Sequence, residues 1–182
     1  MRSAIKFALC TVTCLFGLSW PASSHADEVL PAIVQTQSHA ILKPVGTGTY
    51  RKFAFTIYYA TLWAPDGQWS AAKPYALQLR YARSLSKDTL DDTVMDDIRD
   101  QKVADEPTFA RWSATIEKAL PAVEDGDVLI GLSVPGKKSI LYFNGAPIAT
   151  IDDAALSRAF FNIWLGAGAD EDLRNALLNK GE

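Results

Sequence analysis

The protein has 182 residues, of which 48% are hydrophobic, 21% charged and 10% aromatic, and its formal net charge is −3. This composition is typical of one globular domain and excludes a disordered chain, while the negative balance gives no reason to expect a nucleic-acid-binding protein, which needs a basic surface. Only two histidines (His25 and His39) and two cysteines (Cys10 and Cys14) are present, which excludes most metal-site and catalytic-triad chemistry and predicts no cofactor.

The first 26 residues are typical of a secretory signal peptide. A short positive head (Arg2 and Lys6) precedes an uncharged apolar run over residues 7–20, and small residues lead to Ala26. The run is shorter than the roughly 20 apolar residues of a transmembrane helix, although an uncleaved anchor or a buried N-terminal helix is the alternative. Cleavage after Ala26 would leave residues 27–182 as a single domain without cysteines, periplasmic or secreted.

The first part of that domain is predicted to consist of strands. A first strand over residues 38–45 should end at Gly46-Thr47-Gly48, which is expected to form a tight turn or a bulge. A long run rich in aromatic and β-branched residues predicts a second strand over residues 50–63. Alternation of apolar with polar or small residues predicts a third strand over residues 75–81.

The rest of the chain combines predicted helices with antiparallel hairpins, which indicates an α+β layered structure. Ser86 is expected to cap a helix with an apolar stripe at Leu90, Val94 and Ile98, and a second helix should follow Pro107. The remaining elements are expected to be strands over residues 128–134, 139–143 and 147–151 and helices that begin at Asp152 and Asp170.

A glycine pair and an acidic run each resemble part of a known binding motif, but neither matches that motif in full. Gly46-Thr47-Gly48 has two glycines of a phosphate-binding loop, but it leads into a predicted strand and lacks the rest of either phosphate motif. The acidic run over residues 88–100 does not have the spacing of a calcium loop, and most of its carboxylates should face water on a helix. Asp97 is kept as a candidate site residue because it neighbours the apolar stripe at Val94 and Ile98.

Arg51 is the most informative residue for ligand binding. Because side chains alternate between the two faces of a strand, Arg51 should lie on the more apolar face of the predicted second strand, with Phe53, Phe55, Ile57 and Tyr59. A guanidinium at the edge of an aromatic face needs an anionic partner, and a carboxylate fits its planar fork. Arg51 is therefore a candidate ligand anchor, unless it reaches water at the strand end or pairs with an aspartate of the chain itself.

Several stretches resemble the chalcone-isomerase-like family. Residues 46–63, GTGTYRKF and FTIYYATLW separated by one alanine, look like the family's first strands. The ending FFNIWLG over residues 160–166, with DLRNALL over 172–178, resembles its C-terminal pair of helices, and the hairpins that end at Ile151 fit the same order. The likeness covers nearly all of residues 33–180 and looks closest to the exported bacterial branch of the family.

The resemblance implies an open-faced β-sandwich, in which helices cover one face of a curved antiparallel sheet and a ligand cleft lies between the layers. Members of the superfamily either cyclise chalcones to flavanones or bind fatty acids without chemistry, and an arginine that matches Arg51 holds the anionic group in both. The catalytic branch also uses two threonines, a tyrosine and an asparagine. The matching positions here hold Phe53, Leu90, Asp97 and Ile163. Cyclisation forms an enolate that polar groups must stabilise, and Phe53, Leu90 and Ile163 cannot donate a hydrogen bond to it.

Three hypotheses about function follow. An isomerase or intramolecular lyase of the chalcone-isomerase type is one alternative, and a turnover test with chalcones would reveal it. A structural or interaction protein with a filled cleft is another. The main hypothesis is a non-catalytic binding module in which Arg51 anchors a fatty acid or other small anionic amphiphile. The other residues of that predicted site are Phe53, Phe55, Tyr59, Asp97, Ile163 and Trp164.

Overall fold

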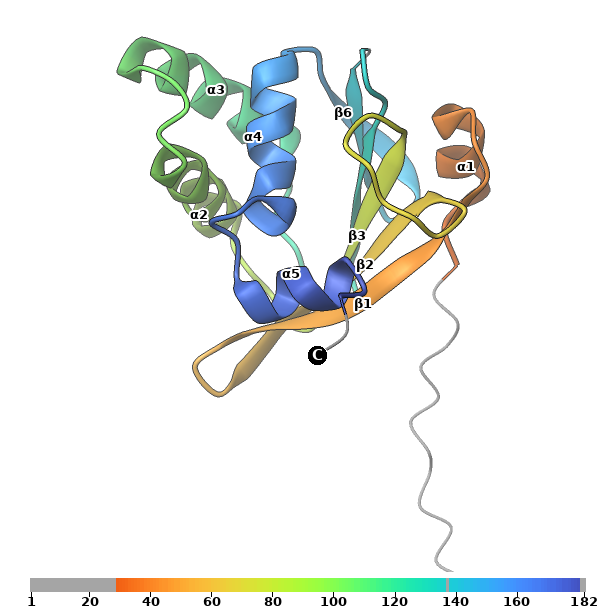
Figure 1. Ribbon diagram of the computed structural model, residues 1–182. Helices are drawn as coiled ribbons and strands as arrows, with labels where there is room; N and C mark the ends of the chain where they lie inside the picture. The colour runs from red at the N-terminus through yellow and green to blue at the C-terminus, as the bar shows by residue number, and fades with distance from the viewer. Residues whose placement is uncertain (1–28, 137, 181–182) are drawn as a thin grey trace, which may run out of the picture.

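The computed structural model describes residues 29–136 and 138–180, so the predicted signal peptide lies outside the described residues. In the described part, one antiparallel sheet has its six strands in sequence order, which confirms the predicted α+β class and open sheet (Figure 1). The strands are β1 (Leu42–Lys52), β2 (Phe55–Pro65), β3 (Tyr75–Tyr81), β4 (Val128–Ser133), β5 (Ser139–Phe143) and β6 (Ala146–Ile151).

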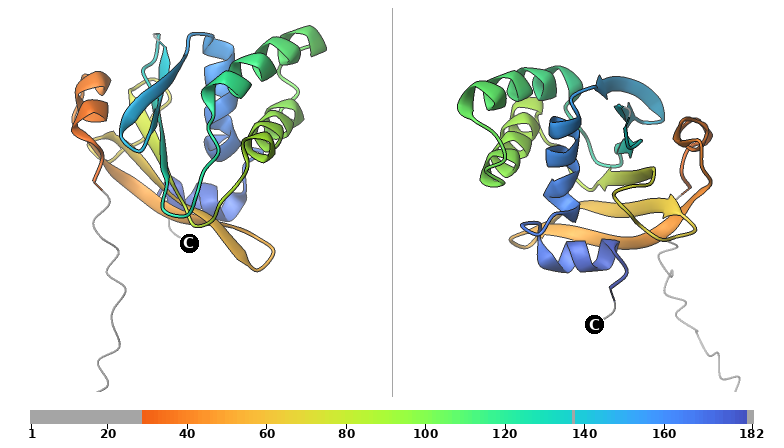
Figure 2. Two further views of the ribbon diagram at one scale, coloured as in Figure 1. Left: turned by 180° about the vertical axis from the view of Figure 1, so that it is seen from behind. Right: turned by 45° about the horizontal axis from the view of Figure 1, so that its top comes forward.

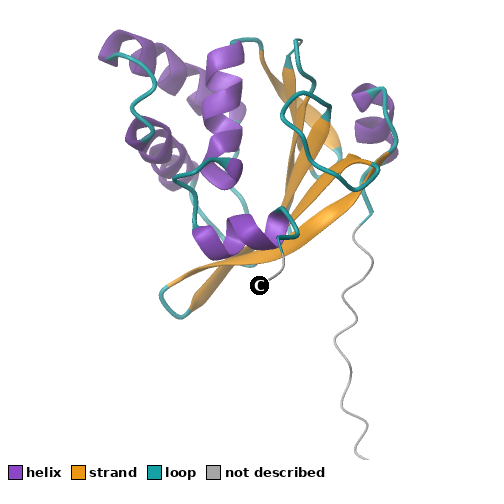
Figure 3. Cartoon of the chain, in the orientation of Figure 1, coloured by secondary structure: helices purple, strands orange, loops and turns teal. Residues whose placement is uncertain are grey.

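Helices cover the two faces of this sheet unequally. Four helices lie on one face, and the short helix α1, which the sequence analysis did not predict, packs on part of the other face (Figure 2; helices are purple in Figure 3). None of the helices in the described residues has the length and apolar character needed to cross a membrane. The helices are α1 (Ala32–Ser38), α2 (Lys87–Asp100), α3 (Glu106–Ala119), α4 (Ala154–Leu165) and α5 (Glu171–Leu177).

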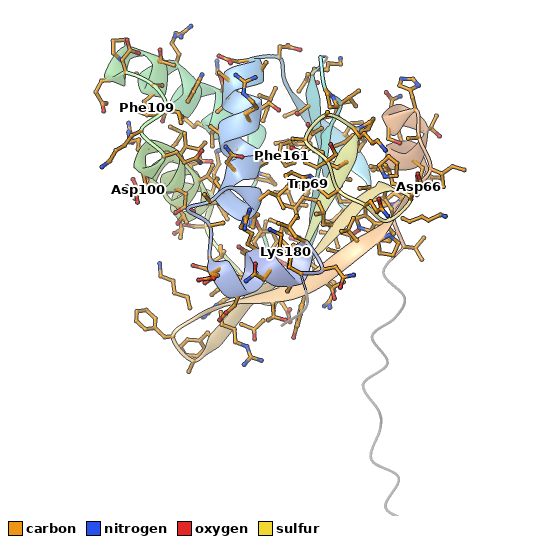
Figure 4. The ribbon with its side chains drawn as sticks, in the orientation of Figure 1. Asp66, Trp69, Asp100, Phe109, Phe161 and Lys180 are labelled. Carbon is orange, nitrogen blue, oxygen red and sulfur yellow. The ribbon has the colours of Figure 1, made fainter. Side chains whose placement is uncertain are left out.

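The main hydrophobic core lies between the sheet and helices α2 to α5. Phe161 of α4 is buried and points toward the sheet, where its ring centroid lies 5.1 Å from that of Tyr75 (Figure 4). A smaller core on the opposite face joins Val34 of α1 to Trp63 and Ile130. Both faces of the central strands are therefore buried, which explains why β2 and β3 contain long apolar runs.

Side-chain caps mark the first residues of several helices, close to the positions predicted from the sequence. The Ser86 hydroxyl accepts a hydrogen bond from the Thr89 amide at 3.2 Å and caps α2 as predicted. The Asp170 carboxylate accepts one from the Leu173 amide at 2.9 Å and caps α5 as predicted. These caps satisfy amide groups that have no partner within the helix, so they depend only on the local sequence.

Helix α4 begins one residue later than predicted, because Asp153 and not Asp152 is its cap. One carboxylate oxygen of Asp153 accepts from the amides of Ala155 (2.8 Å) and Leu156 (3.1 Å). The other accepts from the indole of Trp112 on α3 at 2.9 Å, and these hydrogen bonds hold the pKa of Asp153 below its ordinary value. Asp153 therefore also joins two helices of the layer, a contact that only the tertiary structure supplies.

The predicted turn at Gly46-Thr47-Gly48 is wrong, because β1 continues through these residues. The alternative prediction of a bulge is closer, because the pairing of β1 with β2 shifts between Pro44 and Gly46. The two glycines instead allow α5 to pack directly on the strand. A Cβ atom at Gly46 would overlap the carbonyl oxygen of Ala176, and one at Gly48 would lie 2.7 Å from a side-chain carbon of Leu173. Both glycines are therefore explained by a close helix–strand approach and not by backbone conformation.

The predicted continuous strand over residues 50–63 is also wrong, because the chain reverses at Phe53 and Ala54. These two residues form the turn between β1 and β2. The pairing shifts by one residue just before that turn: Tyr50 pairs with Tyr58 but Arg51 pairs with Thr56. A β-bulge of this kind changes which side chains share a face.

Candidate functional site

A cavity of about 620 Å³ lies between the sheet and the helical layer. Residues from β1 to β4, helices α2, α4 and α5, and the loop between α4 and α5 line it. Its volume lies within the roughly 300–1,000 Å³ of small-molecule pockets. Its wall is mainly apolar, with Ile57, Leu79, Leu90, Val94, Leu129, Phe160 and Ile163 among the lining residues.

A group of aromatic side chains forms the part of the cavity wall next to the strands. The indole nitrogen of Trp164 donates to the Tyr58 hydroxyl at 2.9 Å, which joins α4 to β2. The Tyr58 ring stacks on Tyr50 with centroids 5.1 Å apart and meets Tyr81 edge-on at 5.9 Å. Burial raises the pKa of the Tyr58 and Tyr81 hydroxyls, so both stay protonated at neutral pH and can donate hydrogen bonds into the cavity.

The mouth of the cavity carries charges of both signs. Lys52 at the end of β1 and the acidic residues Asp97, Asp100 and Asp170 all line it, and all four side chains are exposed. Partial burial, helped by Asp100 and Asp96, raises the pKa of Asp97, and Lys52 acts in the opposite direction. The mouth therefore offers one ammonium group among carboxylates.

Gln101 supplies a further polar group to the cavity wall. Its amide nitrogen donates to the carbonyl oxygen of Ala159 at 2.7 Å and ties the end of α2 to α4. Its amide oxygen is buried and has no hydrogen-bond partner among the described residues. This oxygen can accept a hydrogen bond from a ligand that reaches it, because an unsatisfied buried acceptor gains from a partner.

The cavity includes three of the seven residues predicted as a binding site. Asp97, Ile163 and Trp164 line it. The other four (Arg51, Phe53, Phe55 and Tyr59) lie outside it. Phe53 and Phe55 are 93% and 59% exposed at the β1–β2 hairpin, so they do not enclose a ligand there.

The hairpin turn and the choice of strand face explain this difference. Tyr59 lies on the sheet face away from the cavity, where the Arg80 guanidinium carbon is 4.5 Å from its ring centroid. Arg51 pairs with Thr56, one residue out of step with the Tyr50–Tyr58 pair. Arg51 and Tyr59 share a face, as alternation predicted, but this is the face away from the cavity. The prediction that this face lines the cleft is wrong, because Tyr50 and Tyr58 form the face that meets the helices.

Lys52, Tyr58 and Tyr81 also line the cavity, although the sequence did not predict them as site residues. Lys52 and Tyr58 belong to the face of the predicted second strand opposite Arg51, and Tyr58 continues the buried helix-facing series of Ala60 and Leu62. Counting back along β2 from these small and branched apolar residues would have assigned Tyr58 to the core face. Lys52 lies two residues from Tyr50 on the same strand, so alternation along β1 then gives it the same face.

Three of the four positions that the resemblance connects with catalysis line the cavity. These are Leu90, Asp97 and Ile163, whereas Phe53 lies at the hairpin turn outside it. Leu90 and Ile163 have no polar atoms, and a carboxylate at Asp97 would oppose developing negative charge. Among the residues that the structure describes, no group of three histidine, cysteine or acidic side chains could hold a metal ion.

Together the fold and the cavity define a class of protein: an α+β domain with a largely apolar cavity between an open antiparallel sheet and a helical layer. The chain belongs to the chalcone isomerase-like family, whose model matches residues 23–179. It is similar in fold to the crystal structure of an Arabidopsis thaliana fatty-acid binding protein, with a TM-score of 0.61 and 11% identity, over 78% of this chain and 90% of that chain. A comparison with curated proteins finds no match.

Proposed function

We propose that this protein is an exported, non-catalytic binding protein that holds a fatty acid or a similar single-chain amphiphile in the cavity. The observation that carries the proposal is the cavity of about 620 Å³ with its apolar wall and few polar groups. Such a site gains binding free energy from the apolar area that a hydrocarbon chain removes from water. The fold likeness to a protein described as a fatty-acid binding protein supports the same ligand class.

In this proposal the hydrocarbon chain lies among Leu79, Leu129 and Phe160, and the carboxylate lies at the mouth beside Lys52. Arg51, the anchor expected from the sequence, does not line the cavity, whereas its neighbour Lys52 does. The Tyr50 hydroxyl at the same end of the cavity is a second possible donor. A carboxylate at this place avoids burial of its charge.

A binding role without chemistry is supported by the side chains at the cavity wall. Leu90 and Ile163 supply no hydrogen bond to an enolate, and Phe53 is 93% exposed outside the cavity. Export is supported by the signal-like pattern of residues 1–26. The mass of the exported protein tests the expected cut after Ala26.

Replacing Lys52 with alanine is expected to weaken oleate binding by about three- to tenfold, since an exposed charged hydrogen bond contributes on the order of 1 kcal/mol. The matched control is Arg51→Ala, one residue away and outside the cavity, which should leave the affinity nearly unchanged. Titration of the detergent-free protein, with native mass spectrometry to count bound oleate, measures both. Loss of affinity in Arg51→Ala alone would show that Arg51 is the ligand anchor, as the sequence predicts. No uptake of oleate by the unaltered protein would overturn the proposed ligand class.

Binding of an anionic ligand is expected to tighten as the pH falls through the raised pKa of Asp97. Above that pKa the Asp97 carboxylate is charged and repels the ligand head; below it the group is neutral. An alkyl sulfonate below its micelle concentration is the probe, because its own charge does not titrate. Asp97→Asn should remove the dependence and raise the affinity near neutral pH by a factor of about two to five, whereas Asp92→Asn on the same helix, outside the cavity, should behave like the unaltered protein. A pH profile that Asp97→Asn leaves unchanged would contradict this role.

A further inference from the structure

The β1–β2 hairpin ends in an exposed aromatic tip. Phe53 and Phe55 are 93% and 59% exposed, and Ala54 between them is exposed as well. Figure 1 and the left view of Figure 2 show this hairpin extending past helix α5 and away from the body of the protein. A phenyl ring as exposed as that of Phe53 buries almost no apolar surface in the fold, so it would gain free energy by entering an apolar environment.

The backbone of the turn holds Phe53 in a conformation that its residue type disfavours. Phe53 has a φ of 56°, in the left-handed region where Gly, Asn and Asp are the usual residues. A small polar residue would form the same turn at lower cost. The phenyl ring at this position is therefore not required by the turn, which points to a role outside the fold.

A collar of three basic residues surrounds the tip: Arg51, Lys52 and Arg83. The guanidinium carbon of Arg83 lies 4.8 Å from the Phe55 ring centroid, so a cation covers this ring directly. Arg51 and Lys52 precede the turn on β1 and are exposed. The whole chain has a net charge of −3, so this local concentration of positive charge differs in sign from the protein as a whole.

The tip also lies next to the mouth of the cavity. Lys52 and Ile57, on either side of the turn, both line the cavity. Any partner that contacts Phe53 and Phe55 is therefore also close to the cavity entrance. The tip and the entrance form one continuous region, which is basic on the strand side at Lys52 and acidic on the helical side at Asp97, Asp100 and Asp170.

We propose that the β1–β2 hairpin docks the protein on an anionic lipid bilayer, with Phe53 and Phe55 inserted at the interface and the basic collar on the lipid headgroups. Exposed aromatic rings next to arginine and lysine are the combination that binds such an interface, where apolar burial and attraction to anionic lipids add. Docking places the cavity entrance at the bilayer surface, where amphiphiles enter or leave without crossing water.

A bilayer fits this tip better than a protein partner does. A stable protein interface buries about 800 Å² on each partner, far more than three consecutive residues at a turn can offer. A bilayer needs only a shallow insertion of a few side chains, and the positive collar complements its headgroup charge. A second copy of this chain carries the same basic collar, so tip-to-tip pairing would bring like charges together.

Vesicle binding tests the proposal directly. The unaltered protein is mixed with vesicles of equal parts phosphatidylglycerol and phosphatidylcholine, and bound protein is measured by flotation. Phe53→Ser combined with Phe55→Ser should lower the vesicle affinity at least about tenfold, and higher salt should weaken binding of the unaltered protein. The matched control Ile41→Ser, at a residue 79% exposed just before β1 and far along the strand from the tip, should bind as the unaltered protein does.

The outcomes separate the alternatives. Phe53→Trp should keep the affinity, and melting temperatures of all variants should agree, which shows that lost binding is not lost folding. Failure of the unaltered protein to float with anionic vesicles, or an equal loss in Ile41→Ser, overturns the proposal. Concentration-dependent association that the double variant removes would assign the tip to a second copy instead. Oleate uptake is measured in solution without vesicles, so failure of docking and failure of the proposed ligand are distinguishable.

Discussion

Gly46→Ala is expected to lower the free energy of unfolding by about 3 kcal/mol, the upper range for an overpacked site. A Cβ atom there would overlap the carbonyl oxygen of Ala176 and lie 2.7 Å from that of Leu177. Both oxygens belong to the backbone of α5, so no side-chain rotation relieves the overlap and the helix must move. Urea unfolding, followed by tryptophan fluorescence, measures the change.

The matched control is Gly168→Ala, in the loop between α4 and α5. A Cβ atom at Gly168 meets nothing within 4 Å, so this variant should unfold with the same free energy as the unaltered protein. Because Leu173 of α5 lines the cavity, a displaced α5 in Gly46→Ala should also weaken ligand binding. Equal stability of Gly46→Ala and the unaltered protein would show that α5 does not pack on β1 as closely as the structure has it.

Ile163→Trp is expected to reduce oleate affinity at least about tenfold, equivalent to about 1.4 kcal/mol. Ile163 lines the cavity and is half-buried, so a larger side chain there can extend into the empty volume and occupy part of the space that the hydrocarbon chain needs. The open cavity also makes the substitution tolerable for folding, since overpacking costs most where no space is available. Titration with oleate, together with a melting temperature, measures both effects.

The control for this variant is Ile148→Trp on β6. Ile148 is 40% exposed and does not line the cavity, so the same change of residue should leave the affinity unaltered. A ligand that binds Ile163→Trp and Ile148→Trp equally well would have to lie outside the cavity, and the proposed function would then lose its structural basis.

Local interactions made much of the fold predictable from the sequence. Strands β3 and β5 have the predicted bounds, and Ser86 and Asp170 cap their helices as expected. Alternation, capping and turn chemistry depend on residues that are close together in the chain, and such preferences act before distant segments meet. The order of elements was therefore enough to indicate an α+β layered structure.

The hairpin at the cavity mouth was not predictable in this way. Residues 50–63 have the composition of one strand, yet the chain turns at Phe53, which no turn preference favours. Only the pairing of β1 with β2 decides where the turn and the bulge lie. Alternation along β1 then places Lys52 with Tyr50 at the cavity mouth and Arg51 on the opposite face. The anchor expected from the sequence therefore lies one residue from the one that the structure favours.

The fold class, the bounds of β3 and β5 and the family resemblance were predictable from local patterns along the chain. Local patterns did not predict which side chains face the cavity, why position 46 needs a glycine, or that α1 covers part of the second face of the sheet. Each of these depends on contacts between segments far apart in the chain, such as α5 with β1, and no local preference specifies them. The candidate site is built from such contacts, and for this reason the sequence located only three of its residues, Asp97, Ile163 and Trp164.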